Sequence, residues 1–449
     1  MKINSLNNKN SLQNLIETKS VRIGVIGLGQ VGLPTALSFC DVGFSVIGND
    51  LNQSLLQKLS QGESPFEEHG LDNLLKSCIK SQKFVIETSF QKTVTDSNIV
   101  IVCVPTPLGD GIKPDLSALE NVCNSLSDLE LNKKLIIIES SIPPGTMQNI
   151  VLPLIQKINK ECMIAFVPER LSPGQAFSEI QTTPRIIGYI DKISGELAKL
   201  LYGNLVTSEI FLTHVKIAEI SKLVENTYRD VNIAFANEIS FICEKYGIDF
   251  LELQKVCNSH PRVNLLDAGP GVGGPCLPKD PYLLLNPSNS DTISSQIIES
   301  ARKTNDSMPN HVVEIAKSAL ARVDKSLSES KITVLGVTYK ANVSDVRLSP
   351  AKDIISKLVE LSKQVIVYDP KSSESFGAQK STDLWNSISG SDMLIIVTNH
   401  DEFKNLDLNK IKSKMNTPII VDTRRIFDSN QAEEIGIMYY AVGYGGKHS

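Results

Sequence analysis

A segment rich in glycine and proline, GPGVGGPCLPKDPYLLL at residues 269–285, holds a cysteine in a setting that suggests chemistry. Its prolines exclude a helix through the middle and withhold backbone donors from a sheet. We therefore expect a bent loop that displays Cys276, with Lys279 and Asp280 close behind. A thiol is a good nucleophile once ionised, and loop amides with a nearby lysine favour the thiolate. The alternative is a small residue that only fills a turn.

Three residues on a predicted helix have a spacing that suits stabilisation of a negative charge. Lys222, Asn226 and Arg229 stand at positions i, i+4 and i+7, opposite an apolar stripe. A partly desolvated lysine can hold a developing oxyanion, with Asn226 beside it. A solvated face is the usual alternative, but Ala218 and Ile233 lie on the same side as the lysine. The stripe consists of Ile217, Ile220, Val224, Val231, Phe235 and Ile242.

The segment GLGQVG, residues 27–32, follows a predicted strand and precedes a predicted helix, as in dinucleotide-binding folds. Gly27 makes the tight turn, Gly29 lets the backbone approach a pyrophosphate, and Gly32 lets the helix pack on the strand. Asp50 ends the next strand, where a carboxylate binds a ribose 2′-OH and favours NAD over NADP. A glycine turn without a ligand is the alternative. The predicted cofactor contacts here are Gly27, Gly29, Gln30, Val31, Gly32 and Asp50.

The elements that must position these residues follow an α/β pattern. Short apolar strands alternate with helices over residues 20–205 and again from Lys331 to the C-terminus, with a long helix over Thr213–Tyr246 between them. This alternation predicts two Rossmann-like, doubly wound parallel-sheet domains joined by a helical central domain. Thr106 ends one of the strands and can contact the cofactor, although a proline-rich turn is an equal alternative. The expected parts are a polar lead-in at 1–20, an NAD-binding domain at 21–205, a helical central domain with the cysteine loop at 206–325, and a second Rossmann-like domain at 326–449.

The composition excludes several classes of protein. The chain has 449 residues, of which 41% are hydrophobic and 21% charged, and its net charge is −5 without a strong basic block, so a nucleic-acid partner is not expected. None of the eight cysteines forms a C-x-x-C pair, which favours reduced thiols in a cytoplasm over disulfides or a metal site. No signal peptide and no membrane span are expected.

Eight motifs occur in an order that resembles one enzyme family: VIGLGQVGLP, VPTP, VPERLSPG, KLVENTYRD, PRVN, GPGVGGPCLPKDPY, VTYKANVSDVRLSP and VDTRR. From about Val21 to Gly443 the sequence is similar to the UDP-glucose/UDP-N-acetylmannosamine 6-dehydrogenase family. The resemblance implies oxidation of C6 of a nucleotide sugar from alcohol to acid with two NAD, without release of the aldehyde. It also implies a dimer built on the long helix of the central domain, and a UDP-sugar-binding role for the domain at 326–449.

The resemblance assigns catalytic roles residue by residue. Cys276 matches the nucleophile, and Lys222 with Asn226 matches the pair that stabilises the C6 oxyanion. Asp280 matches the acid that orients the lysine and a water. Glu169 matches the general base proposed for thioester hydrolysis.

The remaining matches concern a water and the substrate. Ser141 stands where the family often has a threonine that holds a water, and both residues carry a hydroxyl. Arg262 resembles the arginine that reaches the sugar nucleotide bound by the neighbouring subunit. The other implied contacts are Gly273, Lys340, Arg424 and Arg425 with the substrate, and Arg347 on the nicotinamide side.

The motifs rank the possible sugars. VPERLSPG differs from the NPEFLxEG form of UDP-glucose enzymes and is closer to the branches that act on 2-acetamido sugars. PCLPKD, however, departs from the HCIAVD form of bacterial N-acetylmannosamine members. UDP-N-acetylmannosamine is therefore expected first, UDP-N-acetylglucosamine second and UDP-glucose third. A non-catalytic NAD-binding protein on the same fold is the alternative from another class.

Overall fold

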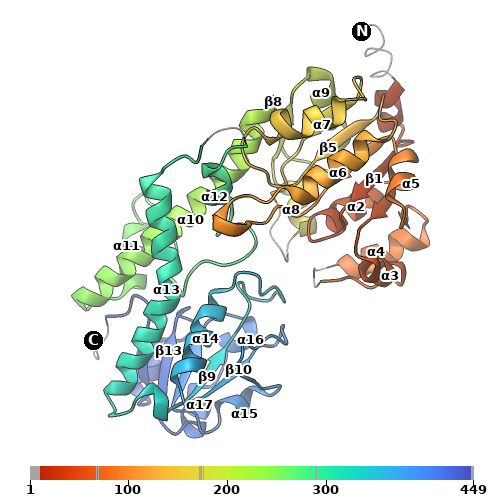
Figure 1. The fold of residues 1–449 in the computed structure, drawn as a ribbon. Coiled ribbons are helices and arrows are strands. Elements are labelled where there is room, and N and C mark those ends of the chain that lie inside the picture. The colour runs from red at the N-terminus through yellow and green to blue at the C-terminus, as the bar shows by residue number, and fades with distance from the viewer. Residues whose placement is uncertain are drawn as a thin grey trace. The chain divides into compact units, whose positions relative to one another are not determined.

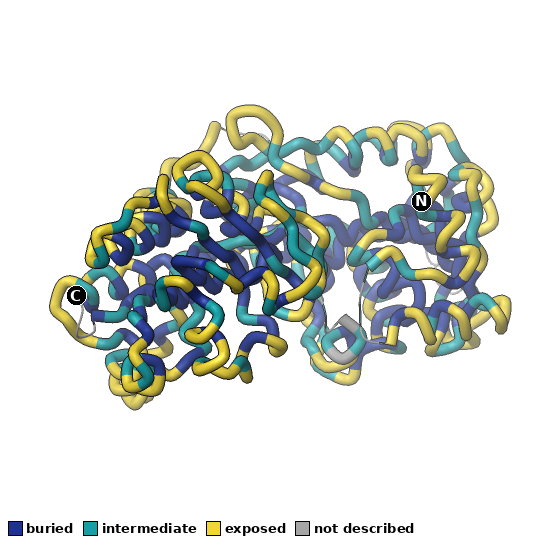
Figure 2. Tube along the Cα trace, turned by 90° about the horizontal axis from the view of Figure 1, so that it is seen from below, coloured by how far each residue is buried: buried dark blue, intermediate teal, exposed yellow. Residues whose placement is uncertain are grey.

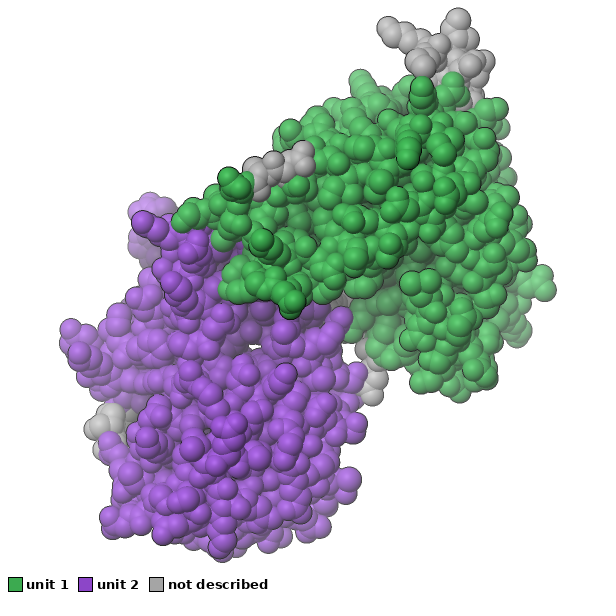
Figure 3. Space-filling view, viewed as in Figure 1, with its two compact units in different colours: residues 1–225, 282–294 green, residues 226–281, 295–449 purple. Residues whose placement is uncertain are grey.

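The structure is a computed structural model that describes residues 11–66, 68, 70–170, 174, 176–288 and 291–445. It divides the chain into two compact units (Figure 3), where the sequence predicted a lead-in and three domains. Unit 1 comprises Met1–Glu225 and Tyr282–Ser294, and unit 2 comprises Asn226–Pro281 and Ser295–Ser449. The central helical region is shared between them, because the division falls within the long helix α10 (Val215–Tyr246). No helix in the described part of the chain is long and apolar enough to cross a membrane.

An eight-stranded sheet forms the centre of unit 1, in the order β3-β2-β1-β4-β5-β6-β7-β8 (Figure 1). Its inner strands are continuous apolar runs that are buried along their length, as expected of a sheet covered on both faces (Figure 2). The sheet is parallel as predicted from β3 to β6, but β7 pairs antiparallel with β6, and β8 then runs parallel to β7. The strands are β1 (Arg22–Ile26), β2 (Ser45–Asn49), β3 (Phe84–Ile86), β4 (Ile99–Val102), β5 (Leu135–Ile138), β6 (Met163–Phe166), β7 (Arg185–Tyr189) and β8 (Ile210–His214).

Helices cover this sheet, and one of them begins before the expected domain boundary. Residues 11–17 are helical, and Leu12 and Ile16 are buried in the same hydrophobic core as β1. The structure therefore differs from the expected polar lead-in over its second half, while residues 1–10 lie outside the described residues. The other helices are α2 (Gly32–Asp41), α3 (Gln53–Ser60), α4 (Leu71–Lys80), α5 (Phe90–Thr95), α6 (Ser117–Ser127), α7 (Leu152–Gln156), α8 (Ala176–Thr182) and α9 (Lys192–Tyr202), with short helices η1 (Asp110–Ile112) and η2 (Met147–Val151).

Unit 2 contains a six-stranded, wholly parallel sheet in the order β11-β10-β9-β12-β13-β14. The strands are β9 (Lys331–Leu335), β10 (Gln364–Tyr368), β11 (Gln379–Lys380), β12 (Met393–Ile396), β13 (Ile419–Asp422) and β14 (Met438–Ala441). The helices are α11 (Phe250–Cys257), α13 (Gln296–Ala321), α14 (Pro350–Leu361), α15 (Leu384–Ile388), α16 (Asp401–Lys404), α17 (Leu408–Lys414), α18 (Ser429–Glu434) and the short η3 (Leu327–Glu329). Helix α12 (Asp280–Leu285), like α10, is divided between the two units. The two α/β sheets and the central helices confirm the predicted fold class.

Helix α10 buries its polar face and exposes its apolar face. Its polar side is covered, since Lys222 and Asn226 are 8% and 6% exposed. Its apolar stripe lies open, with Ile217 57% and Phe235 56% exposed. An amphipathic helix of a single globular chain normally buries its apolar face, so this helix presents an apolar surface that the chain itself does not cover.

Candidate functional site

The turn between β1 and α2 has a shape that only glycine allows at two positions. Gly27 has a φ of +89°, and a Cβ there would lie 2.4 Å from the carbonyl oxygen of Cys103. A Cβ at Gly32 would lie 1.9 Å from the Gly27 carbonyl oxygen. Gly29 is different, because a Cβ there would have no heavy atom of the described protein within 4 Å. The first two glycines are therefore needed by the fold, and the space above the middle one is open.

Asp50 is fixed to the same turn. Its Oδ2 accepts a hydrogen bond from the Leu28 backbone N–H at 2.8 Å, and its Oδ1 accepts one from the Asn52 N–H at 2.9 Å. Helix α2 starts after Val31 without a side-chain cap on its first amides, and Gln30 lies in the turn itself. Uncapped helix amides favour an anion, and a carboxylate at the end of the second strand suits a ribose hydroxyl. These residues fit NAD.

Two further predicted residues meet at the carboxyl edge of the same sheet. Thr106, in the loop after β4, donates a hydrogen bond to the carbonyl of Ser141, in the loop after β5, at 2.5 Å. Next to them, Ser140 Oγ accepts from the Val104 N–H at 2.9 Å. Ligands of open α/β sheets bind beyond the carboxyl ends of the strands. The two loops are thus held together at the edge where such a ligand binds.

The cysteine loop lies against the segment that follows β9. Gly274 has a φ of +91°, and a Cβ there would come within 2.7 Å of the Tyr339 ring. A Cβ at Gly273 would lie 2.6 Å from the carbonyl oxygen of Leu348. The Gly274 N–H donates to the Arg347 carbonyl at 3.0 Å. Close packing of two backbones explains these glycines, and it brings residues 339–348 to the cysteine.

Asp280 is the centre of a polar cluster behind the cysteine. It is fully buried, and its Oδ2 accepts a hydrogen bond from Asn226 Nδ2 at 2.6 Å. Lys279 Nζ lies 2.9 Å from Oδ1 as an ion pair, but without hydrogen-bond geometry, so within the described protein Oδ1 accepts no hydrogen bond. The backbone amides of Lys279 and Asp280 donate to the Cys276 carbonyl at 3.0 and 2.8 Å. A buried carboxylate oxygen is therefore left for a water or an ammonium group.

The thiol of Cys276 shares its surroundings with Tyr339 and Arg347. Burial, with added repulsion from Asp345 and Cys276, raises the pKa of Tyr339 to about 12. The hydrogen bonds to Asp345 raise the pKa of Arg347, and a negative charge at Cys276 raises it further. The phenol thus stays protonated and the guanidinium charged beside the thiol. Tyr339 was missed by the sequence analysis, although it lies inside the motif VTYKANVSDVRLSP.

Lys222 lies one turn before Asn226 on α10, so the two side chains share a face of the helix. Both are buried, whereas the third residue of the predicted set, Arg229, is exposed. The prediction that this side of the helix is not a solvated face therefore holds for Lys222 and Asn226.

Glu169 is bonded within unit 1. Its Oε2 lies 2.6 Å from Nη1 of Arg185, and its Oε1 accepts from the Arg170 N–H at 2.6 Å. Glu169 and Arg185 are only 6% and 2% exposed. Sequence reasoning gave no signal for this arginine, because it lies inside a strand that reads as a core element.

The predicted substrate residues differ in whether other groups of the protein already bind their side chains. Arg425 makes a bidentate contact with Asp249 at 3.0 and 2.7 Å. Arg424 donates through Nε to the Val397 carbonyl at 2.8 Å, and burial lowers its pKa to about 10. Arg425 therefore has a structural partner already. Arg262 and Lys340 are exposed.

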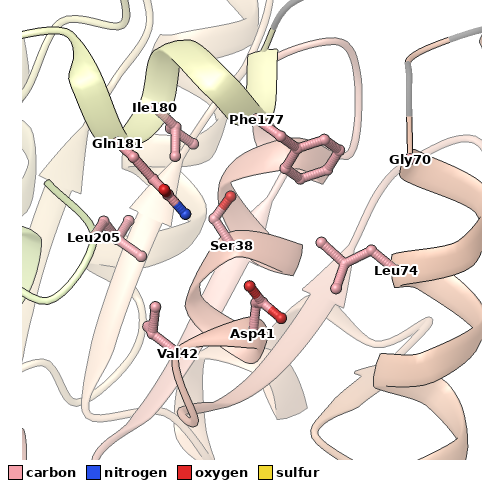
Figure 4. Close-up of a pocket in the computed structure, with 9 residues that line it drawn as sticks. All are labelled: Ser38, Asp41, Val42, Gly70, Leu74, Phe177, Ile180, Gln181 and Leu205. Atoms are coloured by element: carbon pink, nitrogen blue, oxygen red, sulfur yellow. The ribbon is translucent and has the colours of Figure 1, made fainter.

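A cavity of about 270 Å³ lies elsewhere in unit 1, between α2, α4 and α8 (Figure 4). Phe177 and Leu74 form part of its wall, and the buried hydroxyl of Ser38 faces it without a hydrogen bond in the described protein. None of the predicted site residues lines it. Within the described ranges, no group of three or more His, Cys, Asp and Glu side chains is placed to hold a metal ion.

Three family descriptions match consecutive parts of the chain. The NAD binding domain of the UDP-glucose/GDP-mannose dehydrogenase family matches residues 21–206. The central domain of that family matches residues 216–307, and its UDP binding domain matches residues 333–429. The match thus extends over both sheets and the cysteine loop.

Individual relatives agree with this match. A UDP-N-acetyl-D-mannosamine dehydrogenase from Methanocaldococcus jannaschii is 40% identical, over 94% of this chain and 97% of its own. The structure of a UDP-D-ManNAc dehydrogenase from Pyrococcus horikoshii has a TM-score of 0.88 at 36% identity, covering 94% of this chain and 99% of the other. That of a UDP-N-acetyl-mannosamine dehydrogenase from Staphylococcus aureus has a TM-score of 0.82 at 35% identity, covering 94% and 98%.

Proposed function

The chain belongs to the UDP-glucose/GDP-mannose dehydrogenase family, and we propose that it oxidises C6 of UDP-N-acetyl-D-mannosamine from alcohol to carboxylate. As a member of that family it is an NAD-dependent UDP-sugar dehydrogenase. The observation that carries the proposal is the cluster in which Asp280 is buried against Asn226 and Lys279, directly behind Cys276. A protein that only bound NAD would have no use for this arrangement.

The first half of the proposed reaction makes an aldehyde and captures it. The β1–α2 turn with Asp50 would hold NAD, which would supply the hydride acceptor for two successive oxidations. In the first, C6 of the sugar loses a hydride and its hydroxyl loses a proton. The Cys276 thiolate then adds to the aldehyde carbon, forming an S–C bond and a thiohemiacetal oxyanion. Lys222 and Asn226 stabilise that oxyanion, because they present a cation and an amide N–H from one buried face of α10.

The second half releases the acid. Loss of a second hydride from C6 turns the thiohemiacetal into a thioester on Cys276. A water held near Ser141 attacks the thioester carbonyl, its proton passes to Glu169, and the C–S bond breaks to return the thiolate. Asp280 orients the lysine and a water through Oδ1, the oxygen that is ion-paired with Lys279 but accepts no hydrogen bond in the described protein. The sum is one alcohol, one water and two NAD converted to one carboxylate and two NADH, with release of protons.

Binding of the nucleotide sugar is assigned to unit 2. We propose that Lys340 and Arg424 contact the substrate, with Gly273 in the loop beside it, and that Arg262 reaches the substrate of a neighbouring subunit. Arg347 is proposed for the nicotinamide side. Arg425 has the weakest support of this set, since Asp249 engages its guanidinium.

We further propose that the protein works in the cytoplasm. None of the eight cysteines, all of which lie within the described residues, is joined to another by a disulfide. Reduced cysteines are typical of cytosolic proteins.

We expect purified protein to reduce NAD most efficiently with UDP-N-acetyl-D-mannosamine. Its kcat/KM should exceed the values for UDP-N-acetylglucosamine and UDP-glucose by about tenfold or more. UDP-glucose lacks the acetamido group, and UDP-N-acetylglucosamine presents it in the opposite configuration at C2, so each leaves polar groups of the pocket unpaired. NADH absorbance with each of the three sugars measures this. A preference for UDP-glucose would overturn the choice of sugar, and no NADH with any UDP-sugar would overturn the proposed activity.

We also propose that two copies of the chain cover the apolar stripe of α10. Five of its side chains are exposed, and the helix is about 48 Å long at 1.5 Å per residue, so the stripe is too extended to be left in water. A symmetric dimer buries the same surface on both copies.

Phe235→Glu should separate the dimer, because it places a charge in the middle of this stripe. Light scattering of the variant should give half the mass of the unaltered protein. Val359→Glu is the matched control: Val359 is also exposed, on α14 and outside the stripe, and its replacement should leave the mass unchanged. An unaltered protein that is a fully active monomer would contradict the proposal.

A further inference from the structure

A cluster of ionisable side chains lies inside unit 1, below the carboxyl edge of the sheet. Glu139 follows β5 and is 1% exposed, Arg185 lies in β7 and is 2% exposed, and Glu169 follows β6 and is 6% exposed. Only Glu169 has a role in the proposed reaction. Buried charges are costly unless they are paired, so the other two need an explanation.

In all described side-chain hydrogen bonds of Glu139, its carboxylate is the acceptor. Tyr202 Oη donates to Oε1 at 2.5 Å, while Thr35 Oγ1 and Cys103 Sγ lie 3.2 and 3.1 Å from Oε2. Burial raises the pKa of Tyr202 and of Cys103 well above their usual values, so both remain neutral donors. The neutral donors around Glu139 thus stabilise its ionised carboxylate.

The charges of the cluster do not cancel. Arg185 bonds Glu169 through Nη1, its Nη2 is buried without a hydrogen bond in the described protein, and its guanidinium lies over the Tyr202 ring at 5.6 Å. Two carboxylates thus share one cation. Burial, followed by repulsion from Glu169, raises the pKa of Glu139 to about 7, while Arg185, Tyr202 and Cys103 act in the opposite direction. A proton on Glu139 makes the cluster neutral.

We propose that Glu139 and Arg185 are positioning residues for Glu169: Arg185 orients its carboxylate, and the charge on Glu139 sets the net charge of the cluster that receives the proton of the water. The inference rests on the proposed function, in which Glu169 takes a proton from the hydrolytic water. Above about pH 7 Glu139 is ionised, so the cluster carries a net negative charge that favours the arrival of a proton. Below that pH Glu139 is neutral and this electrostatic help is lost. Thioester hydrolysis should therefore become faster as the pH rises through about 7.

Glu139→Gln tests this, because the amide keeps the shape of the side chain and the hydroxyls around it can turn to suit. At about pH 8 the variant should hydrolyse the thioester about three- to tenfold more slowly than the unaltered protein. At about pH 6 the two should be equal, since Glu139 is then already neutral. Rapid quenching and mass spectrometry of the acyl group on Cys276 measure the hydrolytic step separately from the oxidations.

Tyr202→Phe is the companion variant. The variant lacks the hydroxyl that donates a hydrogen bond to the Glu139 carboxylate and stabilises its charge. The pH at which hydrolysis accelerates should therefore move upward. A residue with only a structural role would change the rate at all pH values and leave this midpoint in place. An unchanged pH profile in both variants overturns the inference.

A second measurement separates this inference from the proposed function. Infrared difference spectra between acid and alkaline protein, without substrate, should show a protonated carboxyl band that is lost near pH 7, according to the pKa of about 7 expected for Glu139. The band should be missing in Glu139→Gln. Its absence from the unaltered protein overturns the inference, even if the enzyme makes sugar acid. If the band is present and no sugar acid forms, the proposed function fails instead.

Discussion

Cys276→Ser stops production of the sugar acid, with an expected fall in rate of about a thousandfold or more. A serine hydroxyl ionises far less readily than a thiol. The groups that face position 276 are a phenol that stays protonated and a guanidinium already bonded to Asp345, neither of which takes up its proton. Chromatographic measurement of acid and NADH should give two NADH for each acid with the unaltered protein, and no acid with the variant.

Cys257→Ser provides the matched control for this change. Cys257 ends α11, is partly buried and has no role in the proposed reaction. Its replacement should leave the rate of acid formation unchanged. Mass spectrometry of the unaltered protein during turnover should reveal the sugar attached at Cys276. Acid formation by Cys276→Ser at the unaltered rate would show that the cysteine only fills a turn, and the covalent mechanism would then be wrong.

The parts of the fold that sequence predicts well are those with a local physical cause. The glycine turn after β1 depends on backbone geometry at Gly27 and Gly32, and both contacts arise within a short stretch of the sheet edge. Wholly apolar strands such as β4 and β5 are likewise easy to identify, because every residue in them is buried. Strands β3 and β11 have three and two residues, too few for a periodic pattern, and β8 continues directly into α10.

The parts of the site that sequence does not predict depend on contacts between distant segments. Asn226 and Asp280 are 54 residues apart, and nothing in the sequence around either residue predicts the hydrogen bond between them. The pairing of Glu169 with Arg185 is similar, since the sequence shows only an arginine at the start of an apolar strand and gives no sign of its buried carboxylate partner. The motif supplies the residue types, whereas only the folded chain shows which carboxylate has a free oxygen.

Gly29→Ala should weaken NAD binding by about a hundredfold or more, which corresponds to about 3 kcal/mol of binding energy. Gly29 is exposed in the turn, and a methyl group there points into the open space that the cofactor pyrophosphate must approach. Its φ lies outside the left-handed region and no heavy atom of the described protein lies within 4 Å of the added carbon. The fold should therefore accept alanine, and titration calorimetry should show the loss of NAD binding without a lower melting temperature of the free protein.

Two further alanine variants show whether the loss comes from the ligand or from the fold. Gly32→Ala puts a carbon 1.9 Å from the Gly27 carbonyl oxygen, so it should lower the melting temperature as well as NAD binding. Gly109→Ala adds the same methyl group to another loop of unit 1, where the nearest atom is 3.7 Å away, and should change neither. The contrast between positions 29 and 32 follows from the turn alone: one glycine makes room for the cofactor and the other for the protein's own backbone. If Gly29→Ala bound NAD as tightly as the unaltered protein, the open space above the turn would not be where the pyrophosphate lies.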